Sequence, residues 1–333
     1  MTDKKKGNAF TDNPLVRAIG VQKIVVVLVL ILLVLFFSAA SPAFRQYATI
    51  LSIMDYTYYL ALLGIGVTFC LITGGVDLSI GAGMVCYGLI GGYLIVQKGM
   101  PVGVGLLFTV LCGILMGIIN GILVAKGEIP PFLATLCTMM IARGMGSVAT
   151  KNMSVTWPAA ATAQGWVRSI FKIDIGGTKI PIGFIWVLIL AILMSIVLNK
   201  TKIGRYIIAI GSNKEATRLS GVNVVKYQMA AYIISGLFTG LGGIAYATTF
   251  QALAPGAGAG IELNAIGGAI IGGTSMSGGS GSIAGTILGV FIMSVLQTGL
   301  PYIGLQANNQ QIIIGLVLIV AVFFDVWKNR KLA

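Results

Sequence analysis

Long runs of apolar residues recur along the whole chain, and they limit the folds that are open to it. A helix needs about 20 predominantly apolar residues to cross a bilayer, and most of the runs approach this length. The runs lack the alternation of apolar and polar residues that marks strands, and only helices and closed barrels can span a membrane. The runs cover residues 24–40, 50–72, 80–96, 103–125, 131–150, 181–198, 227–250, 262–275, 282–300 and 309–325.

We therefore predict an all-α polytopic membrane protein with about ten transmembrane helices, some of them broken. The run 262–275 is the weakest candidate, because it is too short to span unless its neighbours extend it or it breaks at depth. Composition agrees with this fold class. Only 9% of the 333 residues are charged, whereas soluble domains carry about 25%.

The net charge of +13 raises the question of nucleic-acid binding. The basic residues fall between the hydrophobic runs and form no polar face, so we predict a chain surrounded by membrane lipid, with no nucleic-acid partner. With both termini in the cytoplasm, fifteen lysines and arginines lie inside and six outside, as the positive-inside rule favours. Residues 1–23 and 199–226 are then cytoplasmic and the loop 151–180 is extracytoplasmic.

The first run also fits a cleaved signal sequence, since a basic head precedes it and the small residues SAASPAF follow. We expect an uncleaved first span. The chain has no histidine, its four cysteines show no CxxC spacing, and no acid pair or nucleophile constellation is visible. We therefore expect no metal site, no cofactor and no enzymatic activity in this chain.

The loop 199–226 is the one sizeable hydrophilic excursion on the predicted cytoplasmic side. Asn213 or Ser212 can cap a short helix over NKEATRLS, which has Glu215 in its first turn and Gly221 just past its end. Such a helix outside the bilayer has a face free to dock on a partner. By composition alone, a solvated connector whose charges only fix the topology is the favoured interpretation.

Glu215, Ala216 and Gly221 have the spacing of the EAA motif in the coupling loop of bacterial ABC importer permeases, with Thr217 where a second alanine is usual. Over nearly its whole length, and in the right order, the chain resembles the permeases of the ribose and galactose importers. One departure is Asn264, where Asp is expected in many relatives, so the resemblance implies no role that needs a negative charge there. The matching strings are GRYIIAIGSNKEATRLSGVNV, TGGVDLSIG, AKG followed by PFLATL, IELNAI, GGTSMSGGSGSIAGT and PYIG.

The resemblance implies a single transmembrane permease domain over residues 1–333 in the bacterial cytoplasmic (inner) membrane. It implies import, by alternating access, of a monosaccharide of the ribose or galactose type or a related small polyol. The solute itself stays open, and xylose or a nucleoside fits equally. The residues implied in coupling to the ATPase are Asn213, Lys214, Glu215, Ala216, Arg218 and Gly221.

The partners implied are a cytoplasmic ABC ATPase that binds ATP and Mg²⁺, an extracytoplasmic sugar-binding protein, and a second permease subunit. A homodimer is the economical assembly, and a heterodimer with a paralogue stays open. The chain itself has no nucleotide site, because its nearest approach to a phosphate loop, GTSMSGGS, has glycine where the lysine must be.

Two glycine-rich segments, LITGGVDLSIGAG at 71–83 and AIIGGTSMSGGSG at 269–281, share six of thirteen residues at an offset of 198. In transporters, paired interruptions of this kind indicate broken helices near the substrate path. The alternative is that the glycines allow close helix packing and that both segments are tight cytoplasmic turns.

Asp77 lies in the first of these segments, and an ionised carboxylate at the centre of a span costs about 2.5–3.5 kcal/mol. We expect it to cap the helix that starts near Leu78, with direct solute contact as the alternative. Glu262 is expected to open a helix in the same way. The candidate residues of the substrate path are Asp77, Ser79, Asn120, Glu262, Asn264, Thr274, Ser275 and Asn308.

A second class of function is an ion-coupled secondary transporter of a small polar solute, in which Asp55, Asp77 or Glu262 carries a proton or sodium. The scarcity of acids in the spans and the loop around Glu215 argue against it. Two further charged residues need partners. Arg143, inside the run 131–150, needs an acid or backbone carbonyls nearby, and Asp77 is a candidate. Asp55 either pairs with Arg45 or faces the binding protein.

Overall fold

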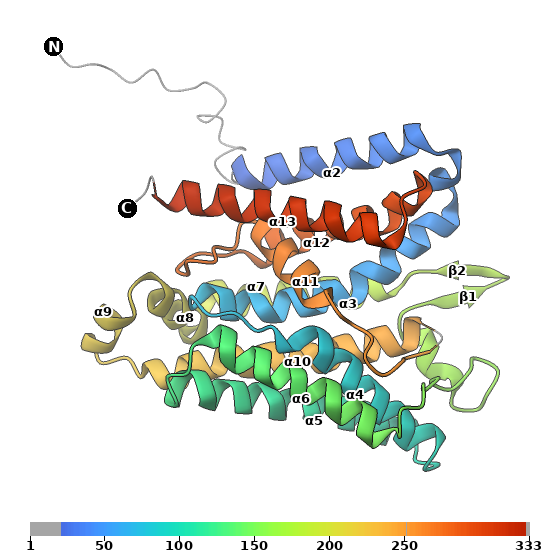
Figure 1. Ribbon diagram of the computed structural model, residues 1–333, viewed down its shortest axis with the longest axis horizontal. Coiled ribbons are helices and arrows are strands. Elements are labelled where there is room, and N and C mark those ends of the chain that lie inside the picture. The colour runs from blue at the N-terminus through green and yellow to red at the C-terminus, as the bar shows by residue number, and fades with distance from the viewer. Residues whose placement is uncertain (1–20, 251, 331–333) are drawn as a thin grey trace.

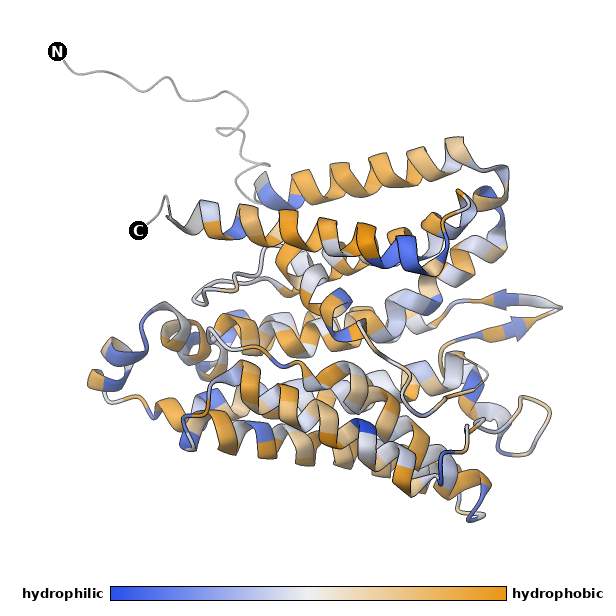
Figure 2. Ribbon diagram, viewed as in Figure 1, coloured by the Kyte–Doolittle hydropathy of each residue, from blue (hydrophilic) through white to orange (hydrophobic). Residues whose placement is uncertain are grey.

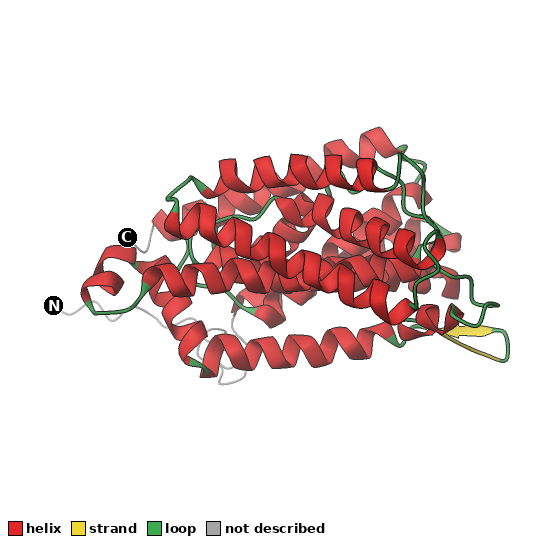
Figure 3. Cartoon of the chain, turned by 90° about the horizontal axis from the view of Figure 1, so that it is seen from below, coloured by secondary structure: helices red, strands yellow, loops and turns green. Residues whose placement is uncertain are grey.

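The computed structural model describes residues 21–250 and 252–330, which form an almost entirely helical bundle (Figure 1, Figure 3). Among the described residues, nine helices are long and apolar enough to cross a membrane. The predicted segment 1–23 falls mostly outside this described part. The nine helices are α2 (Val21–Ala40), α3 (Tyr47–Ile72), α4 (Ser79–Val96), α5 (Val102–Gly121), α6 (Pro131–Ala149), α7 (Gly183–Lys200), α10 (Val224–Thr249), α12 (Ile283–Tyr302) and α13 (Ala307–Arg330).

The prediction of about ten spans holds for nine of the apolar runs and fails for the run 262–275. That run forms the short helix α11 (Ile261–Ile271), whose length of about 16 Å is half of a bilayer core of about 30 Å. The helix ends because Gly273 takes a left-handed φ of +98°, which a helix cannot continue. α11 is therefore a half-length helix inside the bundle.

The loop 199–226 contains more helix than the sequence suggested. α8 (Lys202–Ser212) precedes the expected short helix, α9 (Lys214–Leu219). Thr201 caps α8, because its hydroxyl oxygen accepts a hydrogen bond from the backbone N–H of Gly204. α8 was not predicted, because an 11-residue helix inside a loop that is hydrophilic as a whole produces no long apolar run.

The polar elements lie at the two ends of the bundle. α9 projects from one end, here called the α9 end, and the hairpin of β1 (Ile173–Ile175) and β2 (Thr178–Ile180) projects from the other, the hairpin end (Figure 1). Hydropathy follows this division, since the long helices between the ends are mainly apolar (Figure 2). The bundle thus has the polar–apolar–polar profile of a membrane-spanning protein.

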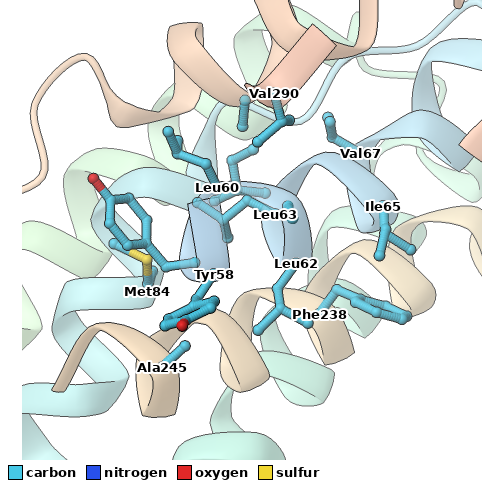
Figure 4. Packing of buried hydrophobic residues seen from close by; sticks show 14 of the residues in the cluster. Tyr58, Leu60, Leu62, Leu63, Ile65, Val67, Met84, Phe238, Ala245 and Val290 are labelled. Atoms are coloured by element: carbon cyan, nitrogen blue, oxygen red, sulfur yellow. The ribbon is translucent and has the colours of Figure 1, made fainter. Parts of the chain in front are cut away.

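α3 lies at the centre of the core, and every residue from Thr57 to Ile72 on it is buried. Its side chains meet Met84 of α4, Phe238 of α10 and Val290 of α12 (Figure 4). Lipid tails are as apolar as these side chains, so burial alone does not hold helices together in a membrane. Close packing and interhelical hydrogen bonds do, such as the one of 2.8 Å between the hydroxyls of Thr68 and Thr286.

Candidate functional site: coupling segment, helix breaks and cavity

The short helix α9 is capped at both ends and exposed. Asn213 Oδ1 accepts a hydrogen bond of 2.8 Å from the backbone N–H of Ala216, which confirms the predicted cap. Ser212, the alternative cap, instead donates its hydroxyl to the carbonyl of Ile208. Past the end of α9, Gly221 takes a φ of +79°, the conformation that ends helices.

The exposed surface of α9 carries one ion pair and one large apolar side chain. Arg218 lies 2.7 Å from Glu215, and this hydrogen bond together with the charge of Glu215 raises the pKa of Arg218. Leu219 is 78% exposed beside them. Lys214 and Ala216 are exposed as well, so the helix presents a mixed charged and apolar face with no partner among the described residues. Leu219 was not predicted as part of this face, although a single leucine in a charged segment was the available signal.

The end of α8 touches both glycine-rich segments. Within this contact, the backbone N–H of Gly279 donates a hydrogen bond of 2.9 Å to the carbonyl of Ile72, so the two segments are bonded to each other. Gly211 lies directly against this bond, because a Cβ on Gly211 would collide with Ile72 O and Gly279 N. The three segments form a junction, called the Gly211 junction here, two residues before the cap of α9.

In the first segment, a buried polar network surrounds Asp77. Its Oδ1 accepts hydrogen bonds from the backbone N–H and the hydroxyl of Ser79, at 3.0 and 2.6 Å, and from the amide of Asn120 at 3.4 Å. Its Oδ2 accepts one of 2.8 Å from Ser235 on α10. Thr138 of α6 completes the network by donating to Asn120 Oδ1 at 2.8 Å. Sequence reasoning found Asp77, Ser79 and Asn120 but missed Thr138 and Ser235.

Asp77 thus acts as the predicted cap, because Ser79, whose N–H it accepts, is the first residue of α4. The carboxylate is only 1% exposed. The expected partnership with Arg143 is wrong, since the bonds to Asp77 come from neutral donors and Arg143 Nε has no hydrogen-bond partner in the described part of the chain. Arg143 lies on α6, whereas Asp77 faces α4, α5 and α10.

The second segment repeats the turn of the first. The N–H of Ser277 donates to the Ser275 hydroxyl at 3.1 Å, in the way that the N–H of Ser79 donates to Asp77. Residues 275 and 277 correspond to 77 and 79 at the offset of 198. Both helices before the segments run toward the α9 end, so the two turns lie in the same orientation (Figure 1). This finding supports a repeated device over chance similarity of glycine-rich stretches.

The remaining contacts of the second segment tie it to α12 and α13. The Ser275 hydroxyl and the N–H of Met276 both donate to Asp325 Oδ2 of α13, at 3.3 and 3.0 Å. Thr274 lies 3.4 Å from the hydroxyl of Thr286 on α12. Both predicted path residues here, Thr274 and Ser275, are therefore buried and bonded within the protein.

Glu262 lies in the first turn of α11, where the sequence predicted an acid at the positive end of the helix. Its Oε1 accepts a hydrogen bond of 3.2 Å from the N–H of Gly260. Oε2 is buried against Gly81 of α4 and has no hydrogen-bond partner among the described residues. The carboxylate faces α4 and not the cavity described next.

A partly open cavity of about 570 Å³ lies between α3, α10, α11, α12 and α13 toward the hairpin end. It is lined by the aromatic rings of α3 and α10 and by amides of the other helices. Of the predicted path residues it contains only Asn264. Asn308 is exposed at the start of α13 and does not line it. The polar and aromatic lining residues are Tyr56, Tyr59, Tyr246, Phe250, Asn264, Gln297, Gln310 and Gln311.

The loop 151–180 folds over the hairpin end of the bundle. Trp157 is buried and donates to the carbonyl of Gly88 at 2.9 Å, while Arg168 donates to the carbonyls of Trp157 and Pro158. Partial burial lowers the pKa of Arg168. Trp166 and both hairpin strands are exposed. The loop therefore presents a fixed surface at this end.

Of the two alternatives for Asp55, the pair with Arg45 is wrong. Asp55 Oδ2 lies 2.6 Å from Lys172 Nζ, just before β1. Arg45 Nε donates instead to the carbonyl of Ser38 at the end of α2. Lys172 is closer because the loop folds back onto α3, which sequence spacing could not indicate.

Comparison with known proteins identifies the family of this chain. Residues 49–322 match a family described as the permease component of the branched-chain amino acid transport system. The chain belongs to this permease family. The permease is 33% identical over 302 residues to the ribose import permease protein of Escherichia coli (strain K12), covering 88% of this chain and 89% of the relative.

Two further relatives are import permeases. The fructose import permease protein of Rhizobium meliloti is 33% identical over 287 residues, covering 86% of this chain and 79% of the relative. The xylose transport system permease protein of E. coli (strain K12) is 29% identical over 371 aligned positions, covering 95% and 94%. No solved structure matches the permease. The permease is a polytopic all-α transport component and not an enzyme.

Proposed function

We propose that this permease is the membrane-spanning subunit of an ATP-driven importer, and that its single permease domain moves a monosaccharide or a related small polyol into the cytoplasm by alternating access. The names of its relatives support the solute class, since they are permeases of ribose, fructose and xylose. ATP and Mg²⁺ bind to a separate ATPase subunit.

The observation that carries this proposal is α9. It is a capped, exposed helix with a charged and apolar face, and it stands immediately after the Gly211 junction. A helix that only connects two spans needs neither an exposed charged and apolar face nor a position beside such a junction. We assign Asn213, Lys214, Glu215, Ala216, Arg218 and Gly221 to the coupling segment that the ATPase grips.

The Gly211 junction supports a route from the ATPase to the solute path. Movement of α9 displaces the end of α8, and the end of α8 touches the backbone of both breaks. Packed segments of this kind pass on rigid-body shifts because they are not continuously deformable. In this proposal the junction passes the movement of α9 to both glycine-rich segments and so to the helices that follow them.

The α9 end is assigned to the cytoplasm and the hairpin end to the outside of the cytoplasmic (inner) membrane, in line with the distribution of lysine and arginine. An extracytoplasmic sugar-binding protein then docks on the loop that contains the hairpin. Two permease copies, as a homodimer, supply the two halves of the path.

The test is reconstitution in proteoliposomes of the permease with the ATPase and binding protein that its neighbouring genes encode. We expect ATP-dependent uptake of radiolabelled D-ribose, D-xylose or D-fructose that persists when a protonophore collapses the proton gradient. Mass measurement of the purified complex should give two copies of this chain. Uptake that is driven by a proton or sodium gradient without the ATPase would instead establish the ion-coupled alternative.

A further inference from the structure

The cavity near the hairpin end combines aromatic faces with amide groups. Tyr59 lies 5.1 Å from Tyr246 and 5.8 Å from Phe250, measured between ring centroids, and Tyr56 lies 6.0 Å from Phe250. Asn264 and Gln297 add amides from α11 and α12. Its volume of about 570 Å³ lies in the range of small-molecule sites, roughly 300–1,000 Å³.

Several polar groups in this cavity are not used by the fold. Among the described residues, no hydrogen-bond partner exists for the hydroxyls of Tyr56, Tyr59 and Tyr246 or for the amides of Asn264 and Gln297. Unpaired polar atoms also occur elsewhere in the described core, such as Ser294 Oγ, but they do not line this cavity, whereas these five groups surround one space. Buried polar groups are normally hydrogen-bonded, so groups left open around one space point to a ligand or water there.

The cavity also lacks charge. None of the described residues that line it is Asp, Glu, Lys or Arg, and Glu262 points away toward α4. An amino acid or another ionic solute would lose its hydration without gaining a charged partner. A neutral polyhydroxylated ring has no charge to desolvate. Its hydroxyls can bond to amides and phenols in place of water, and its C–H face can pack on aromatic rings.

We propose that this cavity is the outward-side binding site for the neutral sugar ring, with the rings of Tyr246 and Phe250 as the apolar surface on which the sugar packs and the amides of Asn264 and Gln297 as the groups that bind its hydroxyls. This inference rests on the proposed function and adds the site of solute contact.

The test uses the reconstituted transporter, with the sugar among D-ribose, D-xylose and D-fructose that the native complex carries. We expect Asn264→Leu and Gln297→Leu each to lower uptake at least tenfold while the ATPase activity stimulated by the binding protein stays within twofold. Asn309→Leu changes an exposed amide outside the cavity and should leave uptake unchanged. Tyr246→Phe, which keeps the ring, should retain at least half of the uptake that Tyr246→Leu loses.

A labelling measurement addresses variants that assemble poorly. Gln297→Cys should react with a membrane-impermeant thiol reagent added from outside, and the transported sugar should slow the reaction at least threefold, while a sugar that is not transported should not. If the native complex takes up a sugar and every cavity variant takes it up equally well, the inference is wrong and the proposed function stands. Absence of uptake of all three sugars by the native complex overturns the proposed function and the inference together.

Discussion

Asp77 shows at the scale of one residue how a charge is held at depth. Its two carboxylate oxygens accept hydrogen bonds from neutral donors. These are the backbone N–H and hydroxyl of Ser79, the Asn120 amide and the Ser235 hydroxyl. Hydrogen bonds to a charged acceptor are about twice as strong as neutral ones. The carboxylate therefore fixes the start of α4 to α5 and α10 without a cation.

This arrangement predicts the effect of Asp77→Asn. The new amide must point its NH₂ at one of these donors, so we expect the free energy of unfolding to fall by about 1–3 kcal/mol. Ser235→Ala removes one hydrogen bond to the charged carboxylate and should cost about 1.5–3 kcal/mol. Thermal unfolding of the purified permease in detergent measures both. A variant Asp77→Asn as stable as the native chain would show that the donors rearrange freely.

At the scale of elements, the Gly211 junction joins the end of α8 to both breaks. Gly211→Ala places a methyl group against the Ile72 carbonyl and the Gly279 amide, so the contact must open. We expect ATPase activity to remain and uptake to fall at least tenfold. The control is Gly144→Ala on α6, where a Cβ meets no atom within 4 Å. Equal uptake in the two variants would contradict a role for the junction in coupling.

The charged face of α9 gives a second prediction at this scale. Glu215→Arg or Arg218→Glu should uncouple ATP hydrolysis from uptake while membrane insertion stays normal. The double variant Glu215→Arg/Arg218→Glu restores the internal ion pair but presents reversed charges to the ATPase, so it should stay uncoupled. Recovery of uptake in the double variant would mean that the pair only stabilises the helix.

The spans and the caps were predictable from the sequence because their signals are local. A run of about 20 apolar residues identifies a helix such as α12, and Asn213 with Gly221 delimits α9. The cavity was not predictable, because Tyr59, Tyr246 and Gln297 come from three helices that are distant in the chain. The same holds for Ser235 beside Asp77. Run length also failed for α11, where Gly273 ends the helix early.

At the scale of the whole molecule, the polar ends define an orientation that can be measured. Gly176→Cys lies in the exposed hairpin turn and Ser220→Cys in the exposed end of α9. In intact cells we expect a membrane-impermeant maleimide to label Gly176→Cys only, and Ser220→Cys to react only after permeabilisation. The native chain provides the background from its own cysteines. The opposite pattern would invert the topology and remove α9 from reach of any cytoplasmic ATPase.

The two matching turns are anchored differently. The one at Asp77 carries its own negative charge and is held by hydrogen bonds from α4, α5 and α10, whereas the one at Ser275 is neutral and donates to the carboxylate of Asp325 on α13. A shift of α13 alone would therefore break the hydrogen bonds of the second turn to Asp325 and leave those of the first turn intact. We therefore expect the turn at Ser275 to be the less rigid of the two.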